Sequence, residues 1–386
     1  MSEWKEYKIK DITSKITSGG TPKSSEAKFY DGNIPWLNTK EINFNRITKT
    51  ERCITEEGYN NSSAKWIPKG SVIVAMYGAT AAKVAYTQID LTTNQACCNL
   101  IIDDNKADSQ FVYYYIQSSY EELLNLSCGA AQQNLNVGVI ADFPILLPPL
   151  DEQKRIVSIL GSMDDKIDLL NRENATLEAM AETFFRQWFV EDAKEDGEEV
   201  TLGDVVKTTS GGTPSRKHPD YYNSGTIYWV KSKELQNSFI FSTEEMITED
   251  AMNNSSAKLL PEKSVLIAMY GATVGEYGIL SKPMTCNQAV CALIPNDNYP
   301  YTYLYLWTAL MKQDFINLAT GAAQQNISQD LIKQQFVCAD TDRIKQFDEL
   351  VNSYFKKMLC NQMQIETLIQ KRDILLPQLL SNAINF

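Results

Sequence analysis

The stretch Ala75-Met76-Tyr77-Gly78-Ala79-Thr80 occurs a second time, unchanged, at residues 268–273. Six further segments recur in the same order, and every offset is 192 or 193 residues. The first copies are Ser18–Pro22, Trp36, Lys40–Glu41, Asn61–Lys65, Asn94–Ala96 and Gly129–Asn134, and the second copies are Ser210–Pro214, Trp229, Lys233–Glu234, Asn254–Lys258, Asn287–Ala289 and Gly321–Asn326. Self-similarity at one fixed offset indicates an internal duplication. The chain therefore contains one fold twice.

Each copy is predicted to mix strands and helices. Apolar runs that end at turn residues predict buried strands, at residues 72–76 and 99–102 in the first copy and at 265–269 and 291–294 in the second. Helical periodicity follows at 110–126 and 302–318, after Asp108-Ser109 as a plausible N-cap in the first copy. Trp36 and Trp229 are expected in the core.

A long helix is predicted after each copy, because apolar residues recur there every seven positions. The apolar positions on this grid include Ile156, Leu160, Met163, Ile167, Leu170, Leu177 and Trp188 in the first segment, and Ile344, Phe347, Val351, Met358, Ile365 and Leu375 in the second. One polar residue interrupts each grid, Asn174 and Asn361. If the helices pack antiparallel with these asparagines paired, Trp188 meets Phe347, Leu160 meets Leu375, and Met163 meets Arg372 with a mismatch.

The predicted fold class is α+β, with two pseudo-two-fold-related mixed α/β domains separated by a two-helix antiparallel coiled coil. The expected bounds are 1–150 for the first domain, 151–195 for the first spacer helix, 196–341 for the second domain and 342–386 for the second spacer helix. A helix of about 37 residues spans about 55 Å. Such a spacer suits a target made of two separated elements.

The charge is concentrated outside the two domains. The whole chain carries −12, and residues 151–199 contribute 6 positive and 14 negative side chains, which is −8 of it. The domains have local stretches with basic residues alone, so binding to a phosphate backbone is permitted although the whole chain is acidic. No apolar run reaches the roughly 18 residues of a membrane span. With eight cysteines, one histidine and no Cys-x-x-Cys, we expect a cytoplasmic chain with reduced thiols and no metal site.

The duplicated glycine loops are candidate phosphate sites, since backbone amides and hydroxyls bind phosphate oxygens. The candidates are Ser18, Gly19, Gly20, Thr21 and Lys23 in the first copy, and Ser210, Gly211, Gly212, Thr213, Arg216 and Lys217 in the second. A tight turn without a ligand explains the same residues equally well. Lys65 and Lys258 are either phosphate ligands or ordinary surface lysines.

Amides and tyrosines form a second group of candidates. Gln132, Gln133, Gln324 and Gln325 carry amides that are able to pair with adenine, and Tyr77 and Tyr270 end a strand. The amide loops are more simply structural or sugar-phosphate contacts, because identical residues cannot distinguish two different DNA sequences. The tyrosines are more simply packed with their hydroxyls satisfied. Residues that read sequence are expected where the copies differ, such as 23–28 against 215–220 and 43–49 against 236–242.

Catalytic motifs are missing from the sequence. It contains no Asn/Asp-Pro-Pro-Tyr/Phe segment, no glycine-rich cofactor loop and no Gly-x-x-x-x-Gly-Lys-Ser/Thr phosphate loop. We expect no catalytic residue, no metal ligand and no cofactor bound by this chain.

The chain resembles the specificity subunit of type I restriction-modification enzymes over nearly its whole length. The resemblance rests on the Ser-Gly-Gly-Thr-Pro loop, the Tyr-Gly strand end, the Gly-x-x-Gln-Gln-Asn loop, the run Leu147 to Gln153 and the closing run Arg372 to Leu380. The second copy departs from the pattern, because Ala339-Asp340-Thr341-Asp342 replaces the Leu-Pro-Pro-Leu start of the helix. This leaves the start of the second helix open.

The resemblance implies a non-catalytic subunit that reads a split site on double-stranded DNA, one half per domain. It implies two methyltransferase subunits as partners, and restriction subunits in the complete endonuclease. S-adenosylmethionine, ATP and Mg²⁺ are then expected on those partners. Two other classes stay open: a self-contained methyltransferase or nuclease, and a coiled-coil scaffold with duplicated protein- or glycan-binding domains.

Overall fold

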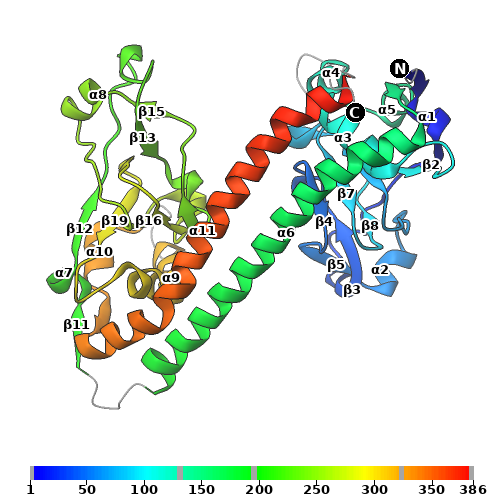
Figure 1. Cartoon of the computed structure of the whole chain (residues 1–386). Helices are drawn as coiled ribbons and strands as arrows, with labels where there is room; N and C mark the ends of the chain where they lie inside the picture. The colour runs from blue at the N-terminus through cyan, green and yellow to red at the C-terminus, as the bar shows by residue number, and fades with distance from the viewer. Residues whose placement is uncertain (1–3, 128–133, 193–197, 321–325, 382–386) are drawn as a thin grey trace. The chain divides into compact units, whose positions relative to one another are not determined.

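The computed structural model describes residues 4–127, 134–192, 198–320 and 326–381, and it divides into two compact units. Unit 1 comprises residues 1–167 and 367–386, and unit 2 comprises residues 168–366. Two long helices, α6 (Leu150–Arg186) and α11 (Thr341–Leu380), each begin in one unit and end in the other (Figure 1).

The described residues of unit 1 form three sheets. Its main sheet has five strands in the order β2-β9-β6-β7-β4, a second has the order β5-β3-β8, and a third pairs β1 with β10. The strands are β1 (Lys5–Lys8), β2 (Thr13–Ser18), β3 (Tyr30–Leu37), β4 (Asn45–Ile47), β5 (Arg52–Ile54), β6 (Val72–Ala75), β7 (Val84–Thr87), β8 (Thr92–Thr93), β9 (Cys97–Ile102) and β10 (Pro144–Leu147). Central β6 is buried along its whole length, as its unbroken apolar run predicts.

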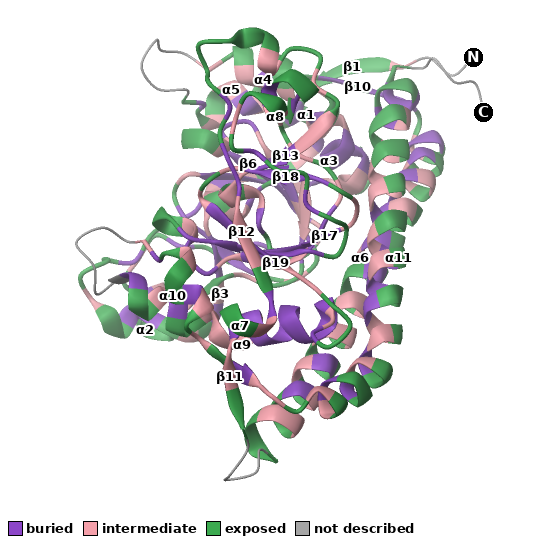
Figure 2. Cartoon of the chain, turned by 90° about the vertical axis from the view of Figure 1, so that its left-hand side faces the viewer, coloured by how far each residue is buried: buried purple, intermediate pink, exposed green. Residues whose placement is uncertain are grey.

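Unit 2 repeats this topology strand for strand. Its main sheet has the order β12-β19-β16-β17-β14, with the smaller sheets β15-β13-β18 and β11-β20. The strands are β11 (Glu199–Thr201), β12 (Lys207–Ser210), β13 (Ile227–Val230), β14 (Ser238–Ile240), β15 (Met246–Ile247), β16 (Val265–Ala268), β17 (Tyr277–Leu280), β18 (Thr285–Cys286), β19 (Val290–Ile294) and β20 (Phe336–Cys338). Strands β6, β18 and β19 are almost wholly buried, and α9 contributes further buried residues (Figure 2).

Helices complete each unit, and the predicted α+β class is confirmed. Unit 1 contains α1 (Ile9–Ile12), α2 (Glu56–Asn60), α3 (Ser109–Ser118), α4 (Tyr120–Asn125) and α5 (Val137–Ala141), and unit 2 contains α7 (Leu202–Val205), α8 (Glu249–Asn253), α9 (Tyr301–Thr320) and α10 (Gln329–Lys333). The helical periodicity predicted at 110–126 is confirmed with one interruption, because the helix breaks at Ser119 between α3 and α4. The corresponding part of α9 carries Leu310 and Met311 in place of two serines and stays helical, in keeping with the higher helix propensity of leucine and methionine.

The long helices also differ in detail from the sequence prediction. A π-helical turn, η4 (Gln187–Glu191), follows α6. Helix α11 begins at Thr341, where the Asp340 carboxylate accepts the backbone N–H of Arg343 at 3.0 Å. An aspartate N-cap thus replaces the Leu-Pro-Pro-Leu start that the first copy uses.

Within unit 2, α6 and α11 run antiparallel. The Asn361 side-chain amide donates to the Asn174 carbonyl oxygen at 2.8 Å, and the rings of Trp188 and Phe347 lie 5.9 Å apart. The residue numbers of both pairs sum to 535, the value that the heptad grids predict. Asn361 is fully buried and its own carbonyl oxygen has no partner among the described residues.

Within unit 1 the start of α6 packs against the end of α11. Leu160 and Leu375 belong to the same apolar cluster. Asp164, the residue after Met163, accepts a hydrogen bond from the Arg372 guanidinium at 2.8 Å. Arg372, for which the grid predicts a mismatch, thus has an ion-pair partner on α6.

Replacing both asparagines, in the double variant Asn174→Leu/Asn361→Leu, is expected to stabilise unit 2 by about 1–2 kcal/mol, because a buried polar pair specifies register at a cost in stability. Equilibrium urea unfolding measures the change. The single variant Asn361→Leu leaves Asn174 and Glu173 without their shared donor, so it should gain less. A destabilised double variant would contradict this account of the seam.

Candidate nucleic-acid interface

The Ser18–Pro22 loop is packed tightly inside unit 1. The Gly20 backbone N–H donates to the Thr93 carbonyl at 2.9 Å, and the Trp36 indole donates to the Gly20 carbonyl at 2.9 Å. A Cβ added at Gly20 would collide with Ser63 and with the backbone of Ala64. The Gly20 amide is thus hydrogen-bonded within the domain. Within the loop Gly19, Gly20 and Pro22 are buried, whereas Thr21 is exposed.

The second copy builds the same loop with the same contacts. The Gly212 N–H donates to the Cys286 carbonyl at 2.9 Å, and the Trp229 indole donates to the Gly212 carbonyl at 2.9 Å. A Cβ at Gly212 would collide with Ser256. Both tryptophans are buried with their N–H groups bonded, as the sequence analysis expects.

Contacts join five exposed residues of unit 1 around this loop. The Thr21 hydroxyl donates to Gln95, and the Lys65 ammonium donates to the Thr17 hydroxyl at 3.0 Å beside the loop. The strand end that carries Tyr77 lies between these segments, because the Met76 N–H donates to the Ala96 carbonyl and Tyr77 forms a β-bridge with Asn134. We call Thr21, Lys65, Tyr77, Gln95 and Asn134 the strand-end patch of unit 1.

The strand-end patch of unit 2 consists of Thr213, Lys258, Tyr270, Gln288 and Asn326. Its contacts repeat those of unit 1: Thr213 donates to Gln288, Lys258 donates to the Thr209 hydroxyl at 3.2 Å, and Tyr270 forms a β-bridge with Asn326. Tyr77 and Tyr270 are each 41% exposed. The structure therefore presents a cation, a phenol and amides on the same exposed strand end twice.

The remaining basic candidates differ in availability. Arg216 is held by Glu245 through two hydrogen bonds of 2.9 and 2.7 Å and stacks over Tyr222. Hydrogen bonds from Arg216, and then from Lys231, lower the pKa of Glu245 to about 2. Lys23 lies 3.7 Å from Glu26, and Lys217 is exposed. Arg216 is thus largely neutralised where it stands.

Four glutamine candidates, Gln132, Gln133, Gln324 and Gln325, lie outside the described residues. Ser18 and Ser210 are half-buried at the ends of β2 and β12, with Gly19 and Gly211 buried behind them. Of the two unit 1 segments that differ from their copies in unit 2, Lys23–Lys28 is mostly exposed. The other, Asn43–Lys49, faces α6.

The Asn43–Lys49 contact with α6 is an ion network that the sequence analysis missed. Arg46 pairs with Asp165 at 2.5 Å and lies 3.9 Å from Asp164, which also accepts from the Tyr114 hydroxyl at 2.6 Å. Burial raises the pKa of Tyr114, so its hydroxyl stays protonated and donates. This segment anchors the domain to its helix. The heptad pattern could not predict this ion network, because Arg46 and Asp164 are far apart in the sequence and Arg46 lies outside the long helices.

Gln95, Gln288, Trp66 and Leu259 also escaped the sequence analysis. The two glutamines lie in repeated Asn-Gln-Ala segments, which were noticed without a role. Trp66 and Leu259 are 45% and 54% exposed and directly follow the repeated lysines. The sequence did contain a signal for Trp66 and Leu259: the two copies differ at the residue that directly follows the unchanged Asn-Ser-Ser-Ala-Lys motif.

The described ranges contain neither a metal-binding cluster nor a membrane-spanning helix. No group of three or more His, Cys, Asp or Glu side chains there is placed to hold a metal ion. No helix in those ranges combines the length and apolarity that a membrane crossing requires. The cysteines described there are free thiols.

Comparison with known proteins identifies the family. Residues 1–179 and 194–337 match the family described as Type I restriction modification DNA specificity domain. The chain belongs to this family. The two matched ranges contain both copies of the repeat, and with them both strand-end patches. The resemblance seen in the sequence is therefore confirmed.

Curated members of the family match along nearly the whole chain. The MjaIX specificity subunit of Methanocaldococcus jannaschii is 27% identical, over 98% of this chain and 92% of that protein. The HindI specificity subunit of Haemophilus influenzae is 23% identical, over 100% of both. The crystal structure of a type I restriction-modification S subunit from M. genitalium has a TM-score of 0.60 at 16% identity, covering 98% of this chain and 96% of that one. The fold is thus shared with this S subunit.

Proposed function

We propose that the chain reads a split target on double-stranded DNA, with one strand-end patch on each half-site. The observation that carries the proposal is the patch itself: one chain of this family presents the same lysine, tyrosine and amides on the same strand end twice. Two equivalent contact surfaces in a single chain call for two contact points on the ligand.

The repeated and the differing residues have separate roles in this proposal. Lys65 and Lys258, with the hydroxyls of Thr21 and Thr213, bind phosphates and place each domain on the duplex, since phosphate contacts position without carrying sequence information. Base edges are read by exposed residues that differ between the copies. The differing exposed segments are Lys23–Lys28 against Ser215–Asp220, and Trp66 against Leu259.

The long helices space the two recognition domains and dock partner subunits in the same proposal. Exposed apolar side chains support a docking role: Leu169 and Met180 on α6 are 50% and 42% exposed, and Ile374 on α11 is 61% exposed. The partners are two methyltransferase subunits and, through them, restriction subunits. S-adenosylmethionine, ATP and Mg²⁺ bind to those partners. This chain supplies sequence specificity and no catalytic residue.

Mapping N6-methyladenine across the genome, with and without the gene for this chain, tests the proposal. We expect one split motif, two short defined sequences with a constant gap, to lose methylation when the gene is deleted. Methylation that is unchanged by the deletion, or a single continuous motif, contradicts the proposal. Gel shifts with the partner methyltransferase separate DNA binding from a protein- or glycan-binding scaffold.

Replacing the patch lysines should weaken binding to all DNA sequences alike. Lys65→Ala and Lys258→Ala are each expected to reduce the slope of log affinity against log salt by about 1, because one phosphate contact is lost. Fluorescence anisotropy of the methyltransferase complex on specific and random duplexes measures the slope.

Lys69 provides the matched control, since it is exposed but precedes β6, at the opposite end of that strand from Tyr77. Lys69→Ala should leave the slope unchanged. Arg216→Ala should change it less than Lys258→Ala, because Glu245 already neutralises Arg216. A loss of sequence preference without a change in slope would show that the lysines read bases instead.

A further inference from the structure

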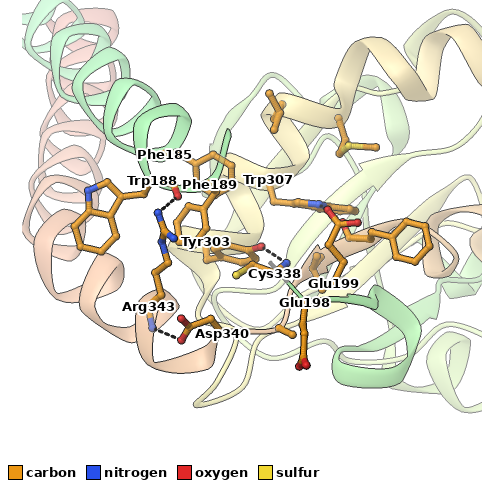
Figure 3. Close-up of a pocket in the computed structure, with 15 residues that line it drawn as sticks. Phe185, Trp188, Phe189, Glu198, Glu199, Tyr303, Trp307, Cys338, Asp340 and Arg343 are labelled. Atoms are coloured by element: carbon orange, nitrogen blue, oxygen red, sulfur yellow. Dashed lines mark hydrogen bonds between the residues drawn. The ribbon is translucent and has the colours of Figure 1, made fainter. Parts of the chain in front are cut away.

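Unit 2 contains a cavity of about 480 Å³ where the end of α6, η4, α9, β20 and the start of α11 come together (Figure 3). This volume lies within the roughly 300–1,000 Å³ that is usual for ligand pockets. Aromatic side chains form much of its wall, namely Phe185, Trp188, Phe189, Tyr303, Trp307 and Phe336.

The aromatic wall is held in place by contacts within unit 2. The Tyr303 ring lies 5.4 Å from Phe185 and 5.1 Å from Phe189, and its hydroxyl accepts the Cys338 backbone N–H at 3.0 Å. The Trp307 indole donates to the Phe336 carbonyl at 3.0 Å. Phe336 itself is 57% exposed at the mouth. The cavity is therefore preformed, with an apolar side chain left facing solvent.

The corresponding place in unit 1 holds a tryptophan of the chain itself. Trp4 packs edge-on against Phe111, with ring centres 6.2 Å apart, and its indole donates to Glu152 at 3.2 Å. Phe111 corresponds to Tyr303 at the offset of 192.

Strand register shows which residue of unit 2 corresponds to Trp4. Tyr7 pairs with Ile145 in unit 1, and Val200 pairs with Val337 in unit 2. Tyr7 and Val200 are 193 residues apart, so Trp4 corresponds to residue 197, which is glycine in the sequence. The described residues of the second copy thus keep the aromatic wall, and its sequence has no tryptophan at the position that matches Trp4.

The mouth of the cavity is acidic. Glu198, Glu199 and Asp340 line it and are exposed. Arg343 is the one basic residue among the lining residues, and its guanidinium donates to the backbone carbonyls of Trp188 and Asp192. These bonds tie the arginine to its own unit. The rim therefore favours a positively charged ligand.

We propose that this cavity is a docking site for a partner protein, which inserts a tryptophan or similar aromatic side chain flanked by basic residues. The aromatic anchor takes the place that Trp4 takes in unit 1, and the flanking lysines or arginines face the acidic rim. Aromatic anchors in preformed pockets dominate many protein interfaces. The proposal goes beyond DNA recognition and does not depend on it.

Calorimetric titration of the full chain with the peptide acetyl-Lys-Lys-Trp-Lys-Lys-amide tests the proposal. We expect saturable binding that weakens roughly ten-fold in Phe336→Ala, because the anchor loses part of its pocket, and that weakens in Glu198→Lys/Glu199→Lys. The same peptide with alanine in place of tryptophan, or with glutamates in place of lysines, should bind at least about ten-fold more weakly.

Leu146→Ala is the matched control, because Leu146 is an exposed apolar residue of β10, the unit 1 counterpart of β20. It should leave peptide binding unchanged. The charge-reversal variant alters exposed residues only, so it decides the question even if Phe336→Ala fails to fold.

Three results would overturn the proposal. One is no binding up to millimolar peptide, and another is equal binding of the tryptophan and alanine peptides, which indicates charge attraction alone. The third is self-association of the chain that Phe336→Ala abolishes, since the occupant is then a second copy.

Discussion

The variant Gly20→Ala should destabilise unit 1 by about 3 kcal/mol, because an added methyl group has no room in the packed loop. The Cβ would meet the Ser63 hydroxyl and two backbone atoms, the Ser63 carbonyl carbon and the Ala64 nitrogen, and the backbone atoms cannot rotate away as a side chain can. Hydrogen exchange resolved by mass spectrometry measures the effect locally. The amides of unit 1 should lose protection while those of unit 2 keep theirs.

Gly78→Ala controls for the general effect of removing a glycine. Gly78 has a φ of +76° and nothing within 4 Å of an added Cβ, so its substitution should cost only about 1 kcal/mol of left-handed strain. Equal effects at the two positions would show that the glycine loop is an open cradle. Gly212→Ala should reproduce the Gly20→Ala result in unit 2.

Asp164→Ala should destabilise unit 1 by about 3–5 kcal/mol, the usual cost of breaking a buried ion pair by removing one partner. The Asp164, Arg46 and Arg372 side chains are only 7%, 5% and 13% exposed. Removal of the carboxylate leaves Arg372 without its interhelical partner and Tyr114 without its acceptor. Urea unfolding, with hydrogen exchange to locate the loss, measures the change.

Asp165→Ala is the matched control, because Asp165 also pairs with Arg46 but its side chain is 73% exposed. Arg46 keeps the neighbouring Asp164 carboxylate and Asp165 is already mostly in solvent, so the loss should be about 1 kcal/mol, well below that of Asp164→Ala. If both substitutions cost the same, the buried network contributes no more than a surface pair. Methylation should also fall in Asp164→Ala, since the first recognition domain is then poorly held on its helix.

Some contacts of the long helices could be predicted from the sequence. The heptad grids place Asn174 opposite Asn361, and the side chains are hydrogen-bonded. The grids did not anticipate Asp164, because an aspartate carries no apolar signal and its partners Arg46 and Tyr114 come from the recognition domain. A periodic pattern predicts contacts between two helices, but not contacts with a third element.

The strand-end patches were predictable only in part. Lys65, Thr21 and Tyr77 lie in repeated motifs, so the duplication singled them out before their positions were known. Gln95 also lies in a repeated motif, but only its contact with Thr21 places it in the patch, and Arg216 proved to be held by Glu245. Ion pairing depends on which acid lies nearby in space, and Glu245 is 29 residues away.

By itself the sequence determined that the chain holds one α+β fold twice, each copy followed by a long helix. Repeats and heptads are properties of residue order, so they need no coordinates. Only the tertiary structure decided that the duplicated glycines are buried and that the Asp164 carboxylate of α6 lies between Arg46 and Arg372. It also decided that unit 2 has an aromatic cavity where unit 1 has Trp4. Each of these features forms where segments that are far apart in the chain pack against one another, and this packing determines which side chains are buried.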